Sequence, residues 1–302
     1  MKDKYKHSSS QLLNFAQDSY FERTSRPIYA IVFLLPFIIF YEVGTILINT
    51  DVLNQSQIRV VAFVWLQNLL ESLGFGGKFA WAAPPLAVVV ILTALQITSK
   101  KQWRFWFGDI LPMAVECILL AVPLIVLTLF LSSSGGSQGD IGRFDNSAIR
   151  TQTDSLPSCS SVAGSSLSSS SGQGGSVEPG QSVLANIVTG IGAGIYEELV
   201  FRLILICVLM LLFQDALKLT HKNSIVLSVL ISAALFSAHH HIDFLSGQLN
   251  PRDPFNWTEF GFRTIAGVYF AVLFAIRGFG ITAGTHAFYN IIGVSITARF
   301  FQ

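Results

Sequence analysis

Long apolar segments recur along most of the chain, and short polar stretches separate them. An α-helix needs roughly 20 apolar residues to cross the hydrocarbon core of a membrane. Repeated segments of this length predict an all-α fold, a polytopic transmembrane helical bundle with about seven to eight spans. The predicted spans are residues 28–49, 81–98, 108–131, 183–213, 224–242, 260–276 and 278–298.

One further apolar stretch, residues 58–73, does not fit a span. Arg59, Gln67, Asn68 and Glu71 interrupt it at intervals that leave an apolar face and a polar face. A helix of this kind lies in the membrane interface or enters the membrane without crossing it. We therefore predict an interfacial or re-entrant amphipathic helix between the first two spans.

The composition agrees with a protein that resides in lipid. Of the 302 residues, 51% are hydrophobic and 12% are charged, whereas soluble domains average about 25% charged residues. The net charge of +1 gives no indication of a nucleic-acid partner. The three cysteines are scattered, which excludes a CxxC metal pair and a disulfide framework. Membrane lipid is thus the expected surrounding, and we expect no nucleic acid as a partner.

The basic residues predict the orientation of the chain. Lysines and arginines concentrate on cytoplasmic loops, next to the ends of spans. An N-terminus in the cytoplasm places every basic cluster on that side and makes this an integral, multi-pass protein of a cell membrane. The clusters are Lys2, Lys4, Lys6, Arg23 and Arg26, then Lys100, Lys101 and Arg104, then Lys218 and Lys222, and finally Arg277.

A Ser/Gly-rich segment divides the chain. Residues 132–182 have low complexity, cannot bury a core, and are predicted to form a flexible loop on the outer side. Residues 1–131 then form an N-terminal membrane region with a polar tail and about three spans. Residues 183–302 form a C-terminal membrane domain, which contains most of the unusual polar residues.

The fourth predicted span carries two adjacent acids and an arginine, Glu197, Glu198 and Arg202. A charge in hydrocarbon costs roughly 2.5–3.5 kcal/mol on insertion scales, so three in about one turn indicate a functional site. Glu198 and Arg202 are four residues apart and share a helix face, which favours a structural ion pair. Glu197 is rotated away from that face, which leaves it for chemistry.

Two later spans carry the other candidate residues. Histidines 239–241 end the fifth span, with Phe236 and His240 on one face. In the last span His286 and Asn290 are four residues apart and project together. Each group alone could be interfacial or an interhelical hydrogen-bond pair. Together with Glu197 they predict a polar site to which three helices contribute.

Small residues predict where these helices approach one another. Glycines allow close backbone contact between membrane helices, notably when they are four residues apart. We expect one such surface upstream of the acids and another one turn before His286. These glycines are Gly190, Gly192 and Gly194, and Gly280 and Gly284.

The N-terminal region also contains acids within predicted spans, Glu42 and Glu116. No basic residue lies nearby in sequence to pair with them. We interpret both as internal hydrogen-bonding groups or as residues that line a pathway.

The C-terminal residues resemble the CPBP family, which comprises type II CAAX prenyl proteases and bacteriocin-processing or immunity proteins. The family pattern is Glu-Glu-x-x-x-Arg, then Phe-x-x-x-His, then His-x-x-x-Asn or Asp. Residues 197–202, 236–240 and 286–290 match these three motifs in order. The resemblance covers roughly residues 183–298 and extends little to the N-terminal region.

This resemblance implies an intramembrane endopeptidase. Glu197 would act as the general base that activates a water, aided by His240. His286 and Asn290 would stabilise the oxyanion that forms on the substrate. The substrate would be a peptide or a protein, which is lipid-modified in some members of the family.

The resemblance also implies supporting roles. Glu198 and Arg202 would hold the helix and tune Glu197, and Phe236 belongs to the second motif. Because three histidines are adjacent, His239 is an alternative to His240 in the catalytic role.

Glu197, His240 and His286 also suit a zinc site with an open position. The spacing is not the H-E-x-x-H arrangement that places two histidines on one helix face. We therefore favour chemistry without a cofactor and keep zinc as the alternative.

Two other functional classes fit some of these residues. A non-catalytic immunity or peptide-binding protein could use the same scaffold. A proton-coupled transporter could use buried carboxylates and histidines as a relay. The chain shows no internal repeat of the kind found in many transporters. Because the predicted orientation places His240 toward the outer side, we do not infer CAAX processing from the resemblance.

Overall fold

The computed structural model describes residues 16, 18–50, 56–75, 80–134, 149–153, 179–244, 248–249 and 255–300. Most of these residues are helical, as the apolar segments predict. The α-helices are α1 (Tyr20–Thr24), α2 (Pro27–Thr50), α3 (Val61–Ser72), α4 (Ala83–Ser99), α5 (Ile110–Ser134), α6 (Pro179–Glu198), α7 (Ile206–Leu211), α8 (His221–His241), α9 (Trp257–Arg277) and α10 (Phe279–Phe300).

Short helical segments of other types extend several of these helices. The 3-10 turns η1 (Ala80–Ala82) and η2 (Phe107–Asp109) precede α4 and α5. The π-helical segments η3 (Leu199–Leu205) and η4 (Leu212–Ala216) flank α7. As a result α6, η3, α7 and η4 form one continuous rod.

Two pairs of short antiparallel strands accompany the helices. Strand β1 (Ser56–Val60) pairs with β2 (Ile149–Thr153), and β3 (Ile242–Asp243) pairs with β4 (Gln248–Leu249). The first pair corrects the prediction that 132–182 is only a flexible loop, because residues 149–153 pair with the segment before α3. Ile149, Thr151 and Thr153 are of the β-branched type that favours strands. Residues 135–148 and 154–178 of the predicted loop lie outside the described residues.

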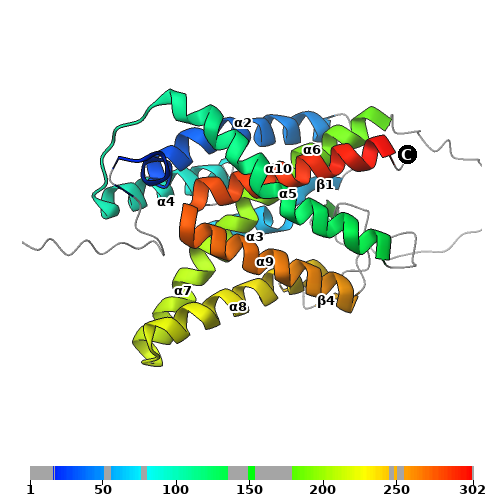
Figure 1. Cartoon of the computed structure of the whole chain (residues 1–302). Helices are drawn as coiled ribbons and strands as arrows, with labels where there is room; N and C mark the ends of the chain where they lie inside the picture. The colour runs from blue at the N-terminus through cyan, green and yellow to red at the C-terminus, as the bar shows by residue number, and fades with distance from the viewer. Residues whose placement is uncertain are drawn as a thin grey trace, which may run out of the picture.

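Helix α10 lies at the centre of the bundle. It packs against α6, α5, α2 and α9, while α8 packs mainly against α9. Figure 1 shows α2, α6 and α10 running alongside one another, with α8 and α9 as a second pair. The turn between α7 and α8 projects away from the other helices in this view.

The described residues include five helices long and apolar enough to cross a membrane. They span residues 27–48, 107–131, 183–216, 221–241 and 257–277, close to the predicted ranges. The two other predicted spans also form helices. However, α4 is shorter, and Thr282, Thr285, His286 and Asn290 reduce the hydropathy of α10. A helix enclosed by its neighbours can accommodate these polar residues, since they meet protein instead of lipid.

The predicted glycine surfaces are close contacts between helices. A Cβ atom on Gly194 would lie 2.5 Å from the backbone nitrogen of Ala287 in α10. A Cβ on Gly280 would lie 2.8 Å from the Cα of Ala30 in α2. Glycine at these positions therefore sets how closely α10 can approach α6 and α2.

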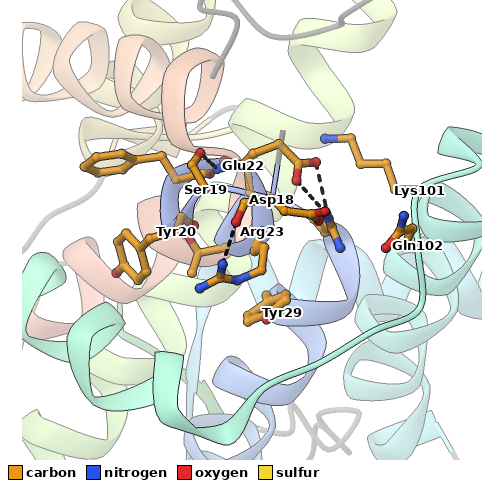
Figure 2. A network of polar contacts seen from close by, with 12 residues as sticks. Asp18, Ser19, Tyr20, Glu22, Arg23, Tyr29, Lys101 and Gln102 are labelled. Atoms are coloured by element: carbon orange, nitrogen blue, oxygen red, sulfur yellow. Dashed lines mark hydrogen bonds and ion pairs between the residues drawn. The ribbon is translucent and has the colours of Figure 1, made fainter. Parts of the chain in front are cut away.

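Charged residues join α1 to the adjoining ends of the bundle helices. Arg26 contacts Glu22 at 2.5 Å and Asp18 at 2.9 Å. Figure 2 shows Asp18 and Arg23 of the same network, where Arg23 donates to the backbone carbonyl of Asp18. Arg23 donates two hydrogen bonds of 3.1 Å to Asp109 at the start of α5. Of the basic residues before the first span, Arg23 and Arg26 are thus paired with acids at this end of the bundle, and Lys2, Lys4 and Lys6 lie outside the described residues.

A second ion pair links α9 with α5. Arg277 at the end of α9 forms two hydrogen bonds with Glu116, at 2.5 and 2.8 Å. Tyr20 donates a third to Glu116 at 2.7 Å. Burial and the Glu116 carboxylate raise the pKa of the Tyr20 hydroxyl, so that it remains a donor. Glu42 similarly accepts a hydrogen bond of 3.1 Å from Tyr196, so both N-terminal acids are internal hydrogen-bonding groups.

These contacts gather several helix ends on one side. Arg277, Asp109 and Arg23 come from the end of α9, the start of α5 and α1 respectively. Gln96 near the end of α4 accepts a 3.0 Å hydrogen bond from the backbone of Ile28 and donates to the carbonyl of Lys101. This grouping brings Arg23, Lys101 and Arg277, from three of the predicted basic clusters, to one end of the bundle. That this side is cytoplasmic remains a prediction.

Helix α3 corresponds to the predicted interfacial or re-entrant segment. It has 12 residues, too few to cross a membrane core of roughly 30 Å. Ala62, Phe63, Val64 and Leu66 are buried against the bundle, while Asn68 is exposed. The segment is amphipathic, as expected, and it packs against α6 and α4.

Gly194→Ala should destabilise the protein by about 1–3 kcal/mol, because the added methyl group collides with the α10 backbone. Gly261→Ala is the matched control, since its Cβ would meet nothing within 4 Å. Reversible unfolding in mixed micelles measures both variants. Equal stability of the two would contradict the packing described for α6 and α10.

Candidate active site

The rod and α8 form a hairpin that brings two of the predicted residues together. The rod extends from residue 183 to 216, and α8 begins at His221 after a short turn. The same number of residues separates Glu197 from Ala216 as separates His221 from His240. Because both arms rise along the hairpin at a similar rate, Glu197 and His240 lie at the same level.

The length of the rod also affects where this level lies in a membrane. Its 34 residues correspond to about 51 Å of α-helix, longer than a hydrocarbon core of roughly 30 Å. A rod of this length either tilts or projects from the core. His240 can therefore be close to Glu197 near the middle of the rod, although it ends its own helix.

Glu198 is held by two cationic or hydrogen-bonding partners. Its Oε1 lies 2.8 Å from Nδ1 of His286 in α10. Its Oε2 lies 3.2 Å from Nε of Arg202, one turn later in the rod. Both Glu198 and Arg202 are fully buried. The predicted structural pair is therefore present, and it also holds His286.

Arg202 has further partners from other helices. Its Nη2 donates a 3.3 Å hydrogen bond to the backbone carbonyl of Gly267 in α9. Its guanidinium carbon lies 4.2 Å from the centre of the Phe236 ring in α8. A buried arginine over an aromatic face gains a cation–π interaction when it is desolvated. Arg202 thus connects α6, α8 and α9, with the Phe236 ring against its guanidinium.

Glu197 lies beside two histidines, one of which, His286, it shares with Glu198. Its Oε1 lies 3.6 Å from Nε2 of His239, and its Oε2 lies 3.9 Å from Nε2 of His286. The residue is 1% exposed. These separations exceed a direct hydrogen bond but place both imidazole rings beside the carboxylate. Glu197, His239 and His286 therefore converge from three helices.

The distances to Glu197 distinguish His239 from His240, the two histidines considered for the catalytic role. His239 is the nearer partner of Glu197, while Nδ1 of His240 lies 3.0 Å from Nδ1 of His239. Nδ1 of His240 also lies 3.1 Å from the carbonyl oxygen of Phe236. His239 and His240 both belong to the site, and His239 has the position first assigned to His240.

The residues placed to hold a metal ion differ from the predicted ligands. Ligand atoms of Glu197, His239 and His240 all lie within 4.8 Å of one another, and all three residues are buried. Carboxylate and imidazole donors of this number fit a catalytic zinc site. The predicted set included His286 instead of His239. His286 is already bonded to Glu198 through Nδ1.

Asn290 lies away from the carboxylate of Glu197. Its Nδ2 donates a 2.9 Å hydrogen bond to the backbone carbonyl of Gly190, two turns before Glu197 in α6. In this structure Asn290 ties α10 to α6. Its role in oxyanion stabilisation remains a prediction, which would require the amide to leave Gly190.

Two aromatic residues of the site were not identified from the sequence. Phe270 in α9 stacks on His286, with ring centres 4.6 Å apart and planes inclined by 16°. Trp65 in α3 lies with its ring centre 5.7 Å from that of His239. An apolar chain with 25 phenylalanines and several tryptophans offers no local pattern that marks these two.

Removing Arg202 should destabilise the protein, because the buried Glu198 carboxylate then keeps only His286 as a partner. Arg202→Met is expected to lower the free energy of unfolding by about 3–5 kcal/mol. The double variant Glu198→Gln/Arg202→Met should recover part of this loss, because it also removes the unpaired charge. Arg299→Met, at an exposed position, serves as the control. Additive losses in the double variant would contradict a coupled pair.

Comparison with known proteins identifies this part of the chain. No curated protein matches the sequence, and no solved structure matches it. Residues 179–292 match the family model described as type II CAAX prenyl endopeptidase Rce1-like. The matched range contains all the clustered residues, from Glu197 to Asn290. With its membrane-crossing helices, the protein is an integral, multi-pass membrane protein. The match over residues 179–292 is consistent with a CPBP family intramembrane protease.

Proposed function

We propose that this protein is an intramembrane endopeptidase in which Glu197 activates a water molecule. The observation that supports the proposal is the division between two adjacent acids. Glu198 is paired with Arg202 and His286, whereas the Glu197 carboxylate lies 3.6 and 3.9 Å from Nε2 of His239 and His286, farther than a direct hydrogen bond. A buried carboxylate held beside two imidazoles suits general-base catalysis.

The reaction follows from these positions. Glu197 takes a proton from water while the water oxygen attacks the carbonyl carbon of the peptide bond. The carbonyl π electrons move to oxygen and form a tetrahedral oxyanion. As the C–N bond breaks, the protonated Glu197 returns its proton to the leaving nitrogen. The products are a new carboxyl group and a new amine, and Glu197 regains its initial state.

The histidines have different roles in this scheme. Nδ1 of His286 donates to Glu198, which fixes the ring and directs Nε2 toward Glu197. His239 approaches from the other side, with His240 beside it. In its imidazolium form His286 also carries a proton on Nε2, and this N–H would stabilise the developing oxyanion in a site that excludes bulk water.

Zinc is the alternative way to activate the water. Glu197, His239 and His240 would hold the ion, which would supply Lewis acidity and lower the pKa of a bound water. In that version His286 would remain on Glu198 and act on the substrate. We favour chemistry without the ion, because Glu197 is then free to accept the proton.

Glu197→Gln should reduce cleavage by at least about 1,000-fold, because an amide cannot accept the proton from water. The assay uses purified protein in nanodiscs with a peptide library that includes prenylated and unmodified members. Glu71→Gln, on the exposed face of α3, is the control. An unchanged unfolding midpoint of Glu197→Gln would show that the loss is chemical. Normal turnover by Glu197→Gln would reject the assignment, and peptide binding without cleavage by the unaltered protein would favour a non-catalytic binding protein.

Exhaustive chelation distinguishes the two chemistries. Without a resident metal, the cleavage rate should stay within about twofold of the untreated protein after dialysis against a strong chelator. Metal analysis of the same sample verifies that zinc has been removed. Loss of activity that returns on addition of zinc, but not magnesium, would establish the zinc version.

A further inference from the structure

We propose that Trp65 of α3 donates a hydrogen bond from its indole nitrogen to the backbone of the bound peptide. The N-terminal region would then supply a substrate-binding residue to the active site. This inference rests on the proposed function and deepens it. It concerns a residue far from the 179–292 range that matches the family model.

Helix α3 is positioned to contact substrate because it packs against the rod beside the site. Phe63 in α3 lies against Tyr196, the residue before Glu197, with ring centres 5.0 Å apart. Tyr196 is also fixed by its hydrogen bond to Glu42. These contacts hold α3 in register with the catalytic part of the rod, so Trp65 has a defined place.

The Trp65 ring borders the catalytic histidine. Its centre lies 5.7 Å from the ring of His239 and 6.2 Å from the ring of Phe201. On the other side it lies 5.5 Å from Phe244, which follows α8 and is 43% exposed. Trp65 therefore lies between the buried catalytic group and a residue at the surface. A peptide that reaches Glu197 from that side would pass along this ring.

The indole nitrogen of Trp65 is buried but has no hydrogen-bond acceptor among the described residues. A buried donor without a partner destabilises a protein, and tryptophans in apolar surroundings usually have one. Nε2 of His239 and Oε1 of Glu197 are likewise buried without hydrogen-bond partners in the described part of the chain. The three atoms belong to neighbouring side chains, and a peptide backbone supplies the acceptor and donor groups that they lack.

The chemistry indicates what Trp65 recognises. An indole nitrogen can donate but cannot accept, so its partner is a carbonyl oxygen. Every peptide has such oxygens, whereas the hydrocarbon of a lipid group has none. The contact would therefore orient the backbone, and the flanking rings of Phe201 and Phe244 would select apolar side chains.

The experiment removes the donor while keeping the ring. Trp65 is replaced by benzothienylalanine, which has nearly the shape of tryptophan but no N–H, and separately by phenylalanine. Trp81→Phe, at a position 48% exposed, is the control. Cleavage kinetics give KM and kcat for a peptide that the unaltered protein cleaves. Tryptophan emission is followed while the same peptide is titrated into Glu197→Gln with and without Trp65.

We expect KM to rise about 3- to 10-fold in both Trp65 variants while kcat changes by less than about twofold. The rise in KM corresponds to the loss of one neutral hydrogen bond in substrate binding. The emission change on peptide addition should depend on Trp65, since the four other tryptophans are exposed. Unchanged KM in the benzothienylalanine protein would overturn the inference while leaving the peptidase intact. If the protein cleaves no peptide, the proposed function fails. In the binding assay, an emission change that persists in the protein without Trp65 would overturn this inference.

Discussion

The burial of three charged residues in one membrane-crossing rod is the constraint on which the rest of the structure depends. Glu198 and Arg202 are fully buried, and Glu197 is 1% exposed. A folded protein tolerates buried charged side chains only when they are paired and hydrogen-bonded. The partners come from three other helices: His286 from α10, Gly267 from α9, and Phe236 and His239 from α8. Satisfying these charges therefore assembles the four helices that form the site.

Close packing is what allows such short contacts. Gly194, three residues before Glu197, leaves space for the backbone of Ala287, the residue after His286. A larger residue would separate α6 from α10 and lengthen the distance from Glu198 to His286. The π-helical segment η3 begins directly after Glu198, and Ser232 of α8 donates to the carbonyl of Phe201 within it. π-helical turns often occur at functional sites, where they change the direction of nearby side chains.

Much of this arrangement could be predicted from the sequence, because the relevant signals are local. Apolar length indicated the helices, the i,i+4 spacing indicated the pair of Glu198 and Arg202, and glycine spacing indicated close packing. The remaining features depend on tertiary contacts. Nothing near Asn290 shows that its amide reaches Gly190, and nothing near Glu116 shows that Arg277 pairs with it. The choice between His239 and His240 required the rotation of α8, which a run of three histidines does not reveal.

The central claim is that Glu197 activates water that becomes part of the product. Single-turnover cleavage in H₂¹⁸O, followed by mass spectrometry of the product and of the protein, tests it directly. The account predicts one ¹⁸O atom in the new carboxyl group of the peptide and none in the peptide that contains Glu197. Label in the Glu197 side chain would indicate a covalent acyl intermediate and would contradict the account.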